Sequence, residues 1–187
     1  MKAIAVYCGA AMGNEAIYEN ATIKLAKWLV KNDYALVYGG GKFGLMGVLA
    51  KTVLQNGGTV YGVLPQELAE RGTALESATN LEVVENMSIR KRRMIELSDA
   101  CIALPGGPGT LEEISEAFSW ARIGDNNNPC VLYNVADYYR PLEKMYDEMT
   151  AKGFLTKADR EKLLFSESLT KIGQFIDGYV PPKIREY

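Results

Sequence analysis

The chain alternates short apolar runs with longer amphipathic segments, and this alternation restricts the folds open to it. Several of the short runs are apolar throughout, which is typical of strands in a parallel sheet covered on both faces. The pattern predicts a single-domain α/β protein with a doubly wound, Rossmann-like parallel sheet and helices on both faces. Strands are expected at residues 3–8, 34–38, 59–64, 81–84, 100–104 and 130–133, and helices at 15–31, 44–55, 87–98, 110–123, 139–152 and 168–178.

A length of 187 residues suits one domain. We expect this domain to span residues 1–180, followed by a short, loosely held tail at 181–187. No apolar run reaches the roughly 18 residues that cross a membrane, and the N-terminus MKAIAVYCGA is interpreted as a buried strand, not a signal peptide. The chain is therefore expected to be cytoplasmic with no membrane partner. A net charge of -2 argues against nucleic acid as a partner.

The chain contains no histidine. This excludes a Ser-His-Asp or Cys-His nucleophile pair and an HExxH zinc site, so carboxylates, tyrosines, lysines or a substrate group must carry any acid–base chemistry. The cysteines Cys8, Cys101 and Cys130 are odd in number and each lies in an apolar run. Reduced, buried thiols are favoured over disulfides or a metal site.

A first glycine-rich turn, GGGKFGLMG, occupies residues 39–47 directly after an expected strand. Its GxGxxG spacing lets the backbone approach an anion at the start of the next helix. A P-loop is not favoured, because Phe43 stands where Ser or Thr belongs. The predicted phosphate contacts are Gly40, Gly41 and Gly44; the alternative is a turn that only packs strand against helix.

A second turn, PGGPGTLEE, occupies residues 105–113 after the strand at 100–104. Thr110 is expected to cap the following helix and to offer its hydroxyl to a phosphate. Glu112 and Glu113 are placed in the first helical turn, where the helix dipole alone could favour them. A carboxylate beside a phosphate loop repels the anion, however, and so suggests a chemical role. The two turns are expected to converge on one crevice at the switch point of the sheet.

Between the turns lies the basic segment MSIRKRR at residues 87–93. Such a run normally decorates a solvated helix face, and that interpretation is favoured for Lys91 to Arg93. Successive side chains diverge by about 100°, so one or two at most can point into a crevice. Arg90 is the candidate.

Three motifs together resemble the LOG ("Lonely guy") family of cytokinin riboside 5'-monophosphate phosphoribohydrolases, long labelled lysine decarboxylases. They are GGGxxGLMG at 39–47, MxxRK at 87–91 and PGGxGTxxE at 105–113, and the similarity runs from VYCGAAMG at 6–13 through SWARIG at 119–124 to LYNVADYYRPL at 132–142. The resemblance implies a Rossmann-like homodimer that hydrolyses the N-glycosidic bond of a purine nucleoside 5'-monophosphate. It makes residues 1–180 a nucleotide-binding hydrolase domain that needs no metal or organic cofactor.

The same resemblance assigns site residues. The catalytic arginine and glutamate of the family fall on Arg90 and Glu113. The phosphate loop falls on Gly106, Gly107, Gly109 and Thr110, and further substrate contacts fall on Met87, Lys91 and Glu112. The helices at 87–98 and 110–123 are expected to form the dimer interface, because Met87, Met94, Ile95, Phe118 and Trp120 exceed the apolar content that one helix face needs.

The sequence departs from the family pattern at several positions. Ser88 replaces a histidine common in the middle motif, Gly72 stands where many members carry a substrate-contacting glutamate, and Ala10 and Ala11 replace serines. Two other functions stay open: a non-catalytic nucleotide carrier or sensor, and a pyridoxal-phosphate-dependent decarboxylase. The sequence does not distinguish a cytokinin nucleotide from AMP or another purine monophosphate as substrate.

Overall fold

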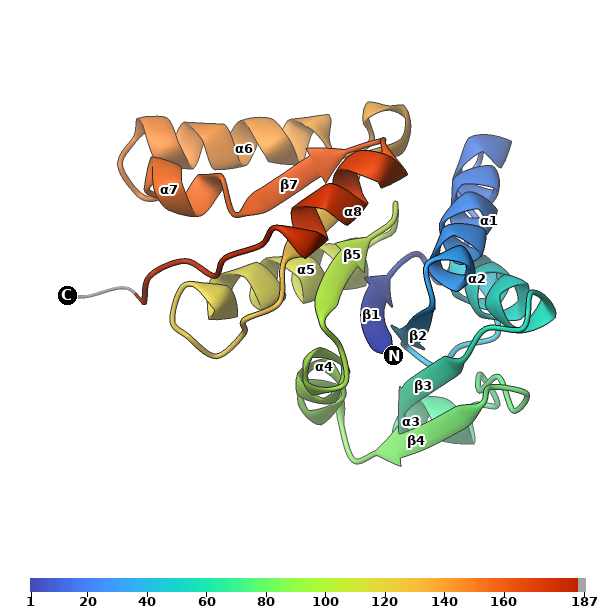
Figure 1. Cartoon of the computed structure of the whole chain (residues 1–187). Coiled ribbons are helices and arrows are strands. Elements are labelled where there is room, and N and C mark those ends of the chain that lie inside the picture. Colours follow the sequence, from blue (N-terminus) through green and yellow to red (C-terminus); the bar gives the residue numbers. More distant parts are fainter. Residues whose placement is uncertain (185–187) are drawn as a thin grey trace.

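The computed structural model describes residues 1–184 and contains a seven-stranded sheet in the order β4-β3-β2-β1-β5-β6-β7 (Figure 1). Every strand pair in it is parallel. The strands are β1 (Lys2–Tyr7), β2 (Tyr34–Tyr38), β3 (Val60–Pro65), β4 (Asn80–Val84), β5 (Ala100–Ala103), β6 (Cys130–Tyr133) and β7 (Leu163–Ser166). β1, β2, β5 and β6 are buried over nearly their whole length, which explains their continuous apolar sequence.

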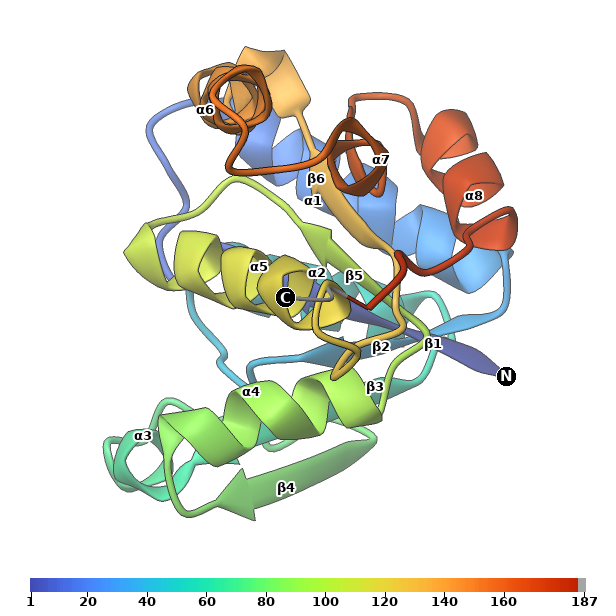
Figure 2. The same cartoon turned by 90° about the vertical axis from the view of Figure 1, so that its left-hand side faces the viewer.

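Helices cover both faces of the sheet, and each face has its own apolar core. Figure 2 shows α4 and α5 in front of the sheet and α1 and α2 behind it. One core joins the sheet to α1, α2 and α8, and the other joins it to α4, α5 and α6. The helices are α1 (Ala16–Lys31), α2 (Gly44–Gln55), α3 (Gln66–Glu70), α4 (Met87–Glu96), α5 (Pro108–Ala121), the 3₁₀ turn η1 (Val135–Asp137), α6 (Arg140–Ala151), α7 (Lys157–Arg160) and α8 (Leu169–Asp177).

This topology confirms the predicted doubly wound sheet. The chain builds β1 to β4 in one direction, then returns to the other side of β1 and adds β5 to β7. The switch point therefore lies between β1 and β5, and ligands of such folds bind at the carboxyl ends of those strands.

Four short elements escaped the sequence analysis: α3, η1, α7 and the edge strand β7. The β7 sequence LLFS is half-buried and too short to show a period. The start of α5 was also misplaced. The helix begins at Pro108, where proline is favoured because its missing N–H would have no helical partner, and its N-cap is Gly107. Thr110 is thus not the cap, and it lies buried inside the helix.

The apolar residues assigned to a dimer interface are mostly used within one chain. Met94, Ile95 and Phe118 are buried in the core between α4, α5 and the sheet. The prediction that they lie at an interface is therefore wrong, because their apolar surface is already covered. The apolar side chains that stay exposed on and beside these helices are Met87, Ile89, Leu111 and Ile123.

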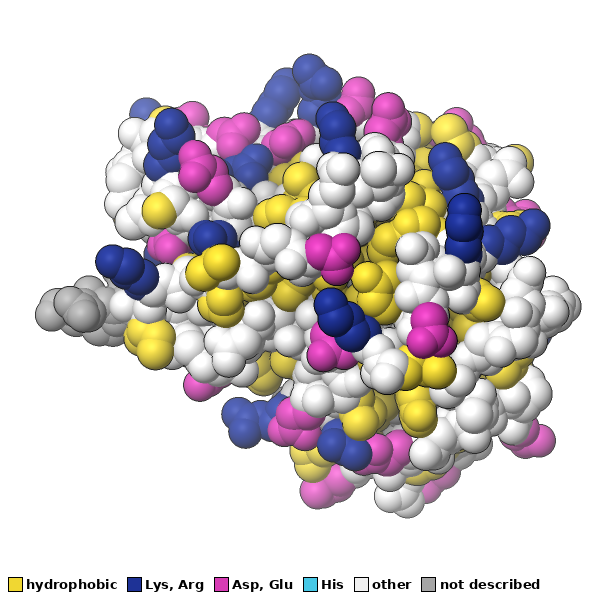
Figure 3. All heavy atoms as spheres, in the orientation of Figure 1, with side chains coloured by type: hydrophobic (Ala, Val, Ile, Leu, Met, Phe, Trp, Pro, Cys, Tyr) yellow, Lys and Arg dark blue, Asp and Glu magenta, His cyan; other side chains and the backbone are white. Residues whose placement is uncertain are grey.

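Other features agree with the sequence analysis. All three cysteines are free and buried. On the face shown in Figure 3, Asp and Glu side chains lie among Lys and Arg side chains, and a few Lys and Arg side chains gather at the right-hand edge. Within residues 1–184 no helix combines the length and the apolar character needed to cross a bilayer. Of the predicted tail, Ile184 lies close to Gly124, and residues 185–187 fall outside the described part of the chain.

Candidate active site

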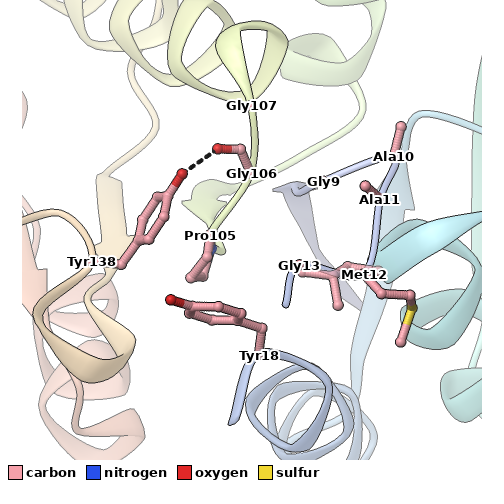
Figure 4. A pocket seen from close by; sticks show the side chains of 11 residues that line it. Gly9, Ala10, Ala11, Met12, Gly13, Tyr18, Pro105, Gly106, Gly107 and Tyr138 are labelled. Carbon is pink, nitrogen blue, oxygen red and sulfur yellow. Dashed lines mark hydrogen bonds between the residues drawn. The ribbon is translucent and has the colours of Figure 1, made fainter. Parts of the chain in front are cut away.

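A cavity of about 390 Å³ opens at the switch point, where the sequence predicted a crevice (Figure 4). Its walls are the loop that follows β1 and the loop that follows β5, closed by two tyrosines and the start of α2. The lining residues are Gly9, Ala10, Ala11, Met12, Gly13, Tyr18, Leu45, Pro105, Gly106, Gly107 and Tyr138. Sequence reasoning assigned neither the β1 loop nor the two tyrosines to the site, although it had noted the loss of two possible hydroxyl contacts at Ala10 and Ala11. The available signal was the pair of glycines after the first apolar run, in VYCGAAMG.

The second glycine turn offers a site for an anion. The N-cap residue of α5 is Gly107, which has no side chain that could accept hydrogen bonds from the first turn. Within residues 1–184 the N–H groups of Gly109 and Thr110 are therefore free for a ligand. The positive end of the helix dipole lies at the same point. A Cβ on Gly106 would meet the Thr110 hydroxyl and would lie 2.8 Å from the backbone nitrogen of Gly9. Glycine is required there because the two loops touch.

The first glycine turn supports the β1 loop. The N–H groups of Leu45 and Met46, in the first turn of α2, donate to the carbonyls of Ala11 and Gly9 at 3.4 Å each. Gly44 has a φ of +57°, and a Cβ there would collide with the backbone of Ala10. This geometry favours the alternative in which the turn packs strand against helix.

The phosphate contacts predicted for this turn stay untested. Gly40 and Gly41 are buried, and the backbone of Gly40 accepts a hydrogen bond from Leu75. Over the described chain, neither they nor Gly44 line the cavity.

Arg90 of α4 and Glu113 of α5 form a buried ion pair. Arg90 Nη2 lies 3.3 Å from Glu113 Oε1, and each side chain is 9% exposed. The same Nη2 lies where a side chain on Gly39 would begin, so this glycine makes room for the guanidinium. Arg90 Nε is buried and has no partner within the described residues. It is a buried donor that no described residue uses, and Arg90 is not among the residues that line the cavity.

Glu113 is not explained by the helix dipole. Because α5 begins at Pro108, Glu112 and Glu113 lie in its second turn. The sequence pattern had indicated the first turn instead. Glu113 lies one helical turn beyond Gly109, whose N–H group is free. Burial raises the pKa of the Glu113 carboxyl, and the neighbouring Arg90 charge opposes this rise. Buried, perturbed carboxyls of this kind are typical of functional sites.

Lys91 is also buried, so the prediction that it faces solvent is wrong. Its Nζ donates to Glu112 Oε1 and to Glu116 Oε2, each at 2.7 Å. Burial by itself would lower the pKa of Lys91, but the two carboxylates outweigh this effect and raise it. Arg90 and Lys91, two successive residues of α4, thus both contact α5. In this structure Lys91 and Glu112 bind each other.

The remaining residues of the basic segment have separate contacts. Arg92 is exposed and lies 5.6 Å from the ring centre of Trp120, and Arg93 pairs with Glu82. Met87 is exposed at the start of α4, and its sulfur lies 3.1 Å from Arg90 Nη1. Within residues 1–184 no cluster of His, Cys, Asp or Glu side chains is arranged to hold a metal ion.

Comparisons with known proteins place the chain in a family. A family model described as "Possible lysine decarboxylase" matches residues 46–174. Cytokinin riboside 5'-monophosphate phosphoribohydrolase LOG1 of Arabidopsis thaliana is 39% identical over 180 residues, which cover 96% of this chain and 84% of that protein. The cytokinin riboside 5'-monophosphate phosphoribohydrolase of Rhodococcoides fascians is 41% identical over 169 residues, covering 90% and 85%.

Among solved structures, the molybdenum cofactor carrier protein of Chlamydomonas reinhardtii superposes with a TM-score of 0.70 at 20% identity, over 94% of this chain and 98% of that one. At this identity the similarity concerns the fold alone. The sequence matches extend over nearly the whole chain. The chain therefore belongs to the LOG family of cytokinin riboside 5'-monophosphate phosphoribohydrolases.

Proposed function

We propose that this protein hydrolyses the N-glycosidic bond of purine nucleoside 5'-monophosphates to a free base and ribose 5-phosphate. The observation that carries the proposal is the buried Arg90–Glu113 pair, one helical turn beyond the uncapped start of α5. An anion site and a carboxylate about one turn apart on one helix suit a substrate with a phosphate at one end and a cationic transition state beside it. The names of the relatives support the same reaction.

In the proposed reaction the bond between ribose C1' and the base nitrogen breaks, and its electron pair leaves with the base. The sugar passes through an oxocarbenium-like state that the Glu113 carboxylate stabilises, while the carboxylate also orients the attacking water. The water oxygen bonds to C1', and one water proton ends on the base. Arg90 holds Glu113 in place, and its Nε is a donor that no described residue uses.

Several of the other predicted site residues have a role in the proposed reaction. The phosphate is bound by the backbone at Gly106, Gly107 and Gly109 and by the Thr110 hydroxyl, which lies beside Gly106. Lys91 and Glu112 flank the pair through their own ion pair. Carboxylate, guanidinium and water supply all the chemistry, so the proposed hydrolysis requires no cofactor.

The residues do not fit a pyridoxal-phosphate decarboxylase. That cofactor is held by a lysine Schiff base, which forms from a neutral amine. Lys91 is the one buried lysine within residues 1–184, and Glu112 and Glu116 keep it protonated.

The direct test incubates the purified protein with a panel of purine nucleoside mono-, di- and triphosphates, including cytokinin nucleotides. Chromatography then identifies any released base. We expect release from monophosphates, and the ranking within the panel identifies the substrate. Binding without release would instead support the nucleotide carrier or sensor.

We expect the turnover number to fall with acid at a higher pH than an ordinary glutamate would give. Glu113 must be ionised to act, and burial raises its pKa, so the active carboxylate is lost sooner as the pH decreases. The measurement is kcat at saturating AMP from pH 4 to pH 8. Saturation is needed because the second pKa of the phosphate, about 6, affects substrate binding. An acid limb below the value of 4.5 for an unperturbed glutamate would contradict this role.

We also propose that the protein is a cytoplasmic homodimer. Exposed apolar side chains at α4 and α5, namely Met87, Ile89 and Leu111, support an interface there. The three reduced, buried thiols support the compartment. Light scattering at micromolar concentration should give twice the 20.6 kDa of one chain, and a mass of 20.6 kDa would refute the dimer.

A further inference from the structure

The segment at residues 134–139 has a strained backbone that the proposed reaction does not explain. Ala136 and Asp137 are consecutive and have φ of +52° and +59°, a region that L residues seldom adopt. The buried Asn134 holds the turn from within. Its Oδ1 accepts from the N–H of Tyr139 at 2.7 Å, and its Nδ2 lies 3.4 Å from Asp137 Oδ1. Strain of this kind persists where surrounding contacts enforce it, often beside a functional site.

The turn delivers two tyrosine hydroxyls to the β5–α5 loop. Tyr138 donates to the carbonyl of Gly106, and Tyr139 donates to the carbonyl of Leu104, each at 2.6 Å. The carbonyl between them, that of Pro105, accepts from the N–H of Gly9 at 3.2 Å. Three successive carbonyls of the loop are thus bound by the protein. Figure 4 shows Tyr138 reaching Gly106 across the cavity mouth.

Peptide planarity converts the bonds on Pro105 and Gly106 into an orientation of donors, whereas the bond from Tyr139 to Leu104 orients none because Pro105 has no N–H. In a trans peptide the N–H points opposite to the C=O. The Tyr138 hydroxyl on the carbonyl of Gly106 therefore directs the N–H of Gly107 away from the tyrosine. The Gly9 contact on Pro105 fixes the N–H of Gly106 in the same way. Carbonyl groups that would repel an anion are hydrogen-bonded to the protein, and the N–H groups that would bind the anion are fixed in orientation.

Burial does not account for the position of Tyr138. Its side chain is 42% exposed, whereas Tyr139 is buried. Its ring stacks edge-on against Tyr18 at 5.9 Å and Tyr139 at 5.0 Å, which keeps the hydroxyl on Gly106. An exposed tyrosine that is held by two rings and bonded to a glycine carbonyl contributes orientation more than core stability.

We propose that Tyr138 is a positioning residue that sets the backbone donors of the β5–α5 loop for the phosphate of the substrate. The inference rests on the proposed function for the identity of the substrate, but it can be tested without turnover. Ribose 5-phosphate, the proposed product, is a stable probe of the anion site.

The test titrates ribose 5-phosphate into the wild-type protein and into Tyr138→Phe by calorimetry. Tyr138→Phe removes one neutral hydrogen bond from the loop, so affinity should fall about 5- to 10-fold with little change in melting temperature. Tyr34→Phe is the matched control, because Tyr34 packs on Trp28 at the amino end of β2, far from the crevice.

The outcomes separate the two proposals. Unchanged affinity in Tyr138→Phe, or a loss equal to that in Tyr34→Phe, overturns the positioning role. A loss of affinity that is accompanied by a matching drop in melting temperature also overturns it, because the tyrosine would then be structural. No binding by the wild type would refute the anion site and this inference with it. Normal binding with no cleavage of any nucleotide would refute only the hydrolase.

Discussion

The variant Glu113→Gln is expected to lose turnover by about 10²-fold or more while it still binds the nucleotide. Glutamine keeps the shape of the side chain and can still accept a hydrogen bond from Arg90, 3.3 Å away in the native protein. It removes the negative charge that faces the oxocarbenium-like sugar. The effect should therefore appear in kcat, measured as base released from AMP, with the affinity for AMP nearly retained.

Glu116→Gln is the matched control for this variant. Glu116 lies on the same helix and also forms an ion pair, but its partner is Lys91 and not Arg90. Its replacement should leave most of the activity. Melting curves of both variants are needed, because disturbing a buried ion pair can cost several kcal/mol of stability. A folded Glu113→Gln protein with nearly wild-type turnover would show that the carboxylate is structural, and it would favour the nucleotide carrier.

The protein should cleave AMP and leave adenosine almost untouched. The free N–H groups at the start of α5 and the helix dipole act only on a substrate that carries the 5'-phosphate. Hydrogen bonds to a charged group contribute about 1.5–3 kcal/mol each, so losing two or three lowers kcat/KM by several orders of magnitude. Because part of this binding energy orients the ribose against Glu113, kcat should fall together with affinity.

Two variants test how much Thr110 and Arg90 each contribute to the cleavage of AMP. Thr110→Ala should show a milder defect on AMP, since it removes one hydroxyl and leaves the backbone donors. Arg90→Ala should show a severe one, since it leaves Glu113 buried without its partner. Adenine release from AMP and adenosine is measured side by side. Comparable kcat/KM for the two substrates would mean that neither glycine turn binds phosphate.

The sheet was predictable because its central strands carry a clear signal. β1, β2, β5 and β6 are buried on both faces, and their sequences are apolar without alternation. Three of the elements that were missed lie at the margin: β7 is a half-buried edge strand, and α3 and α7 have no buried residue. Such elements depend on neighbours that are distant in sequence, so no local period reveals them.

The candidate site was predictable only in part. The motifs pointed to Arg90 and Glu113, and the structure brings these two together. Lys91 was misjudged, because its burial depends on Glu112 and Glu116, which follow it by 21 and 25 residues. Thr110 was misjudged because two glycines and a proline at residues 106–108 made the start of α5 ambiguous. The role of Tyr138 requires a fold that brings residues 32 positions apart into contact.

The position of β1 in the centre of the sheet has a consequence for protein synthesis. The ribosome makes β1 well before its partner β5, which follows about a hundred residues later: Ala3 exchanges backbone and side-chain bonds with Asp99, 96 positions away. Until β5 emerges, the nascent sheet keeps an open central edge, a surface prone to wrong pairing. The crevice, whose walls follow β1 and β5, cannot exist before that moment. A ligand of this crevice could therefore stabilise the nascent chain only after the β5–α5 loop has left the ribosome.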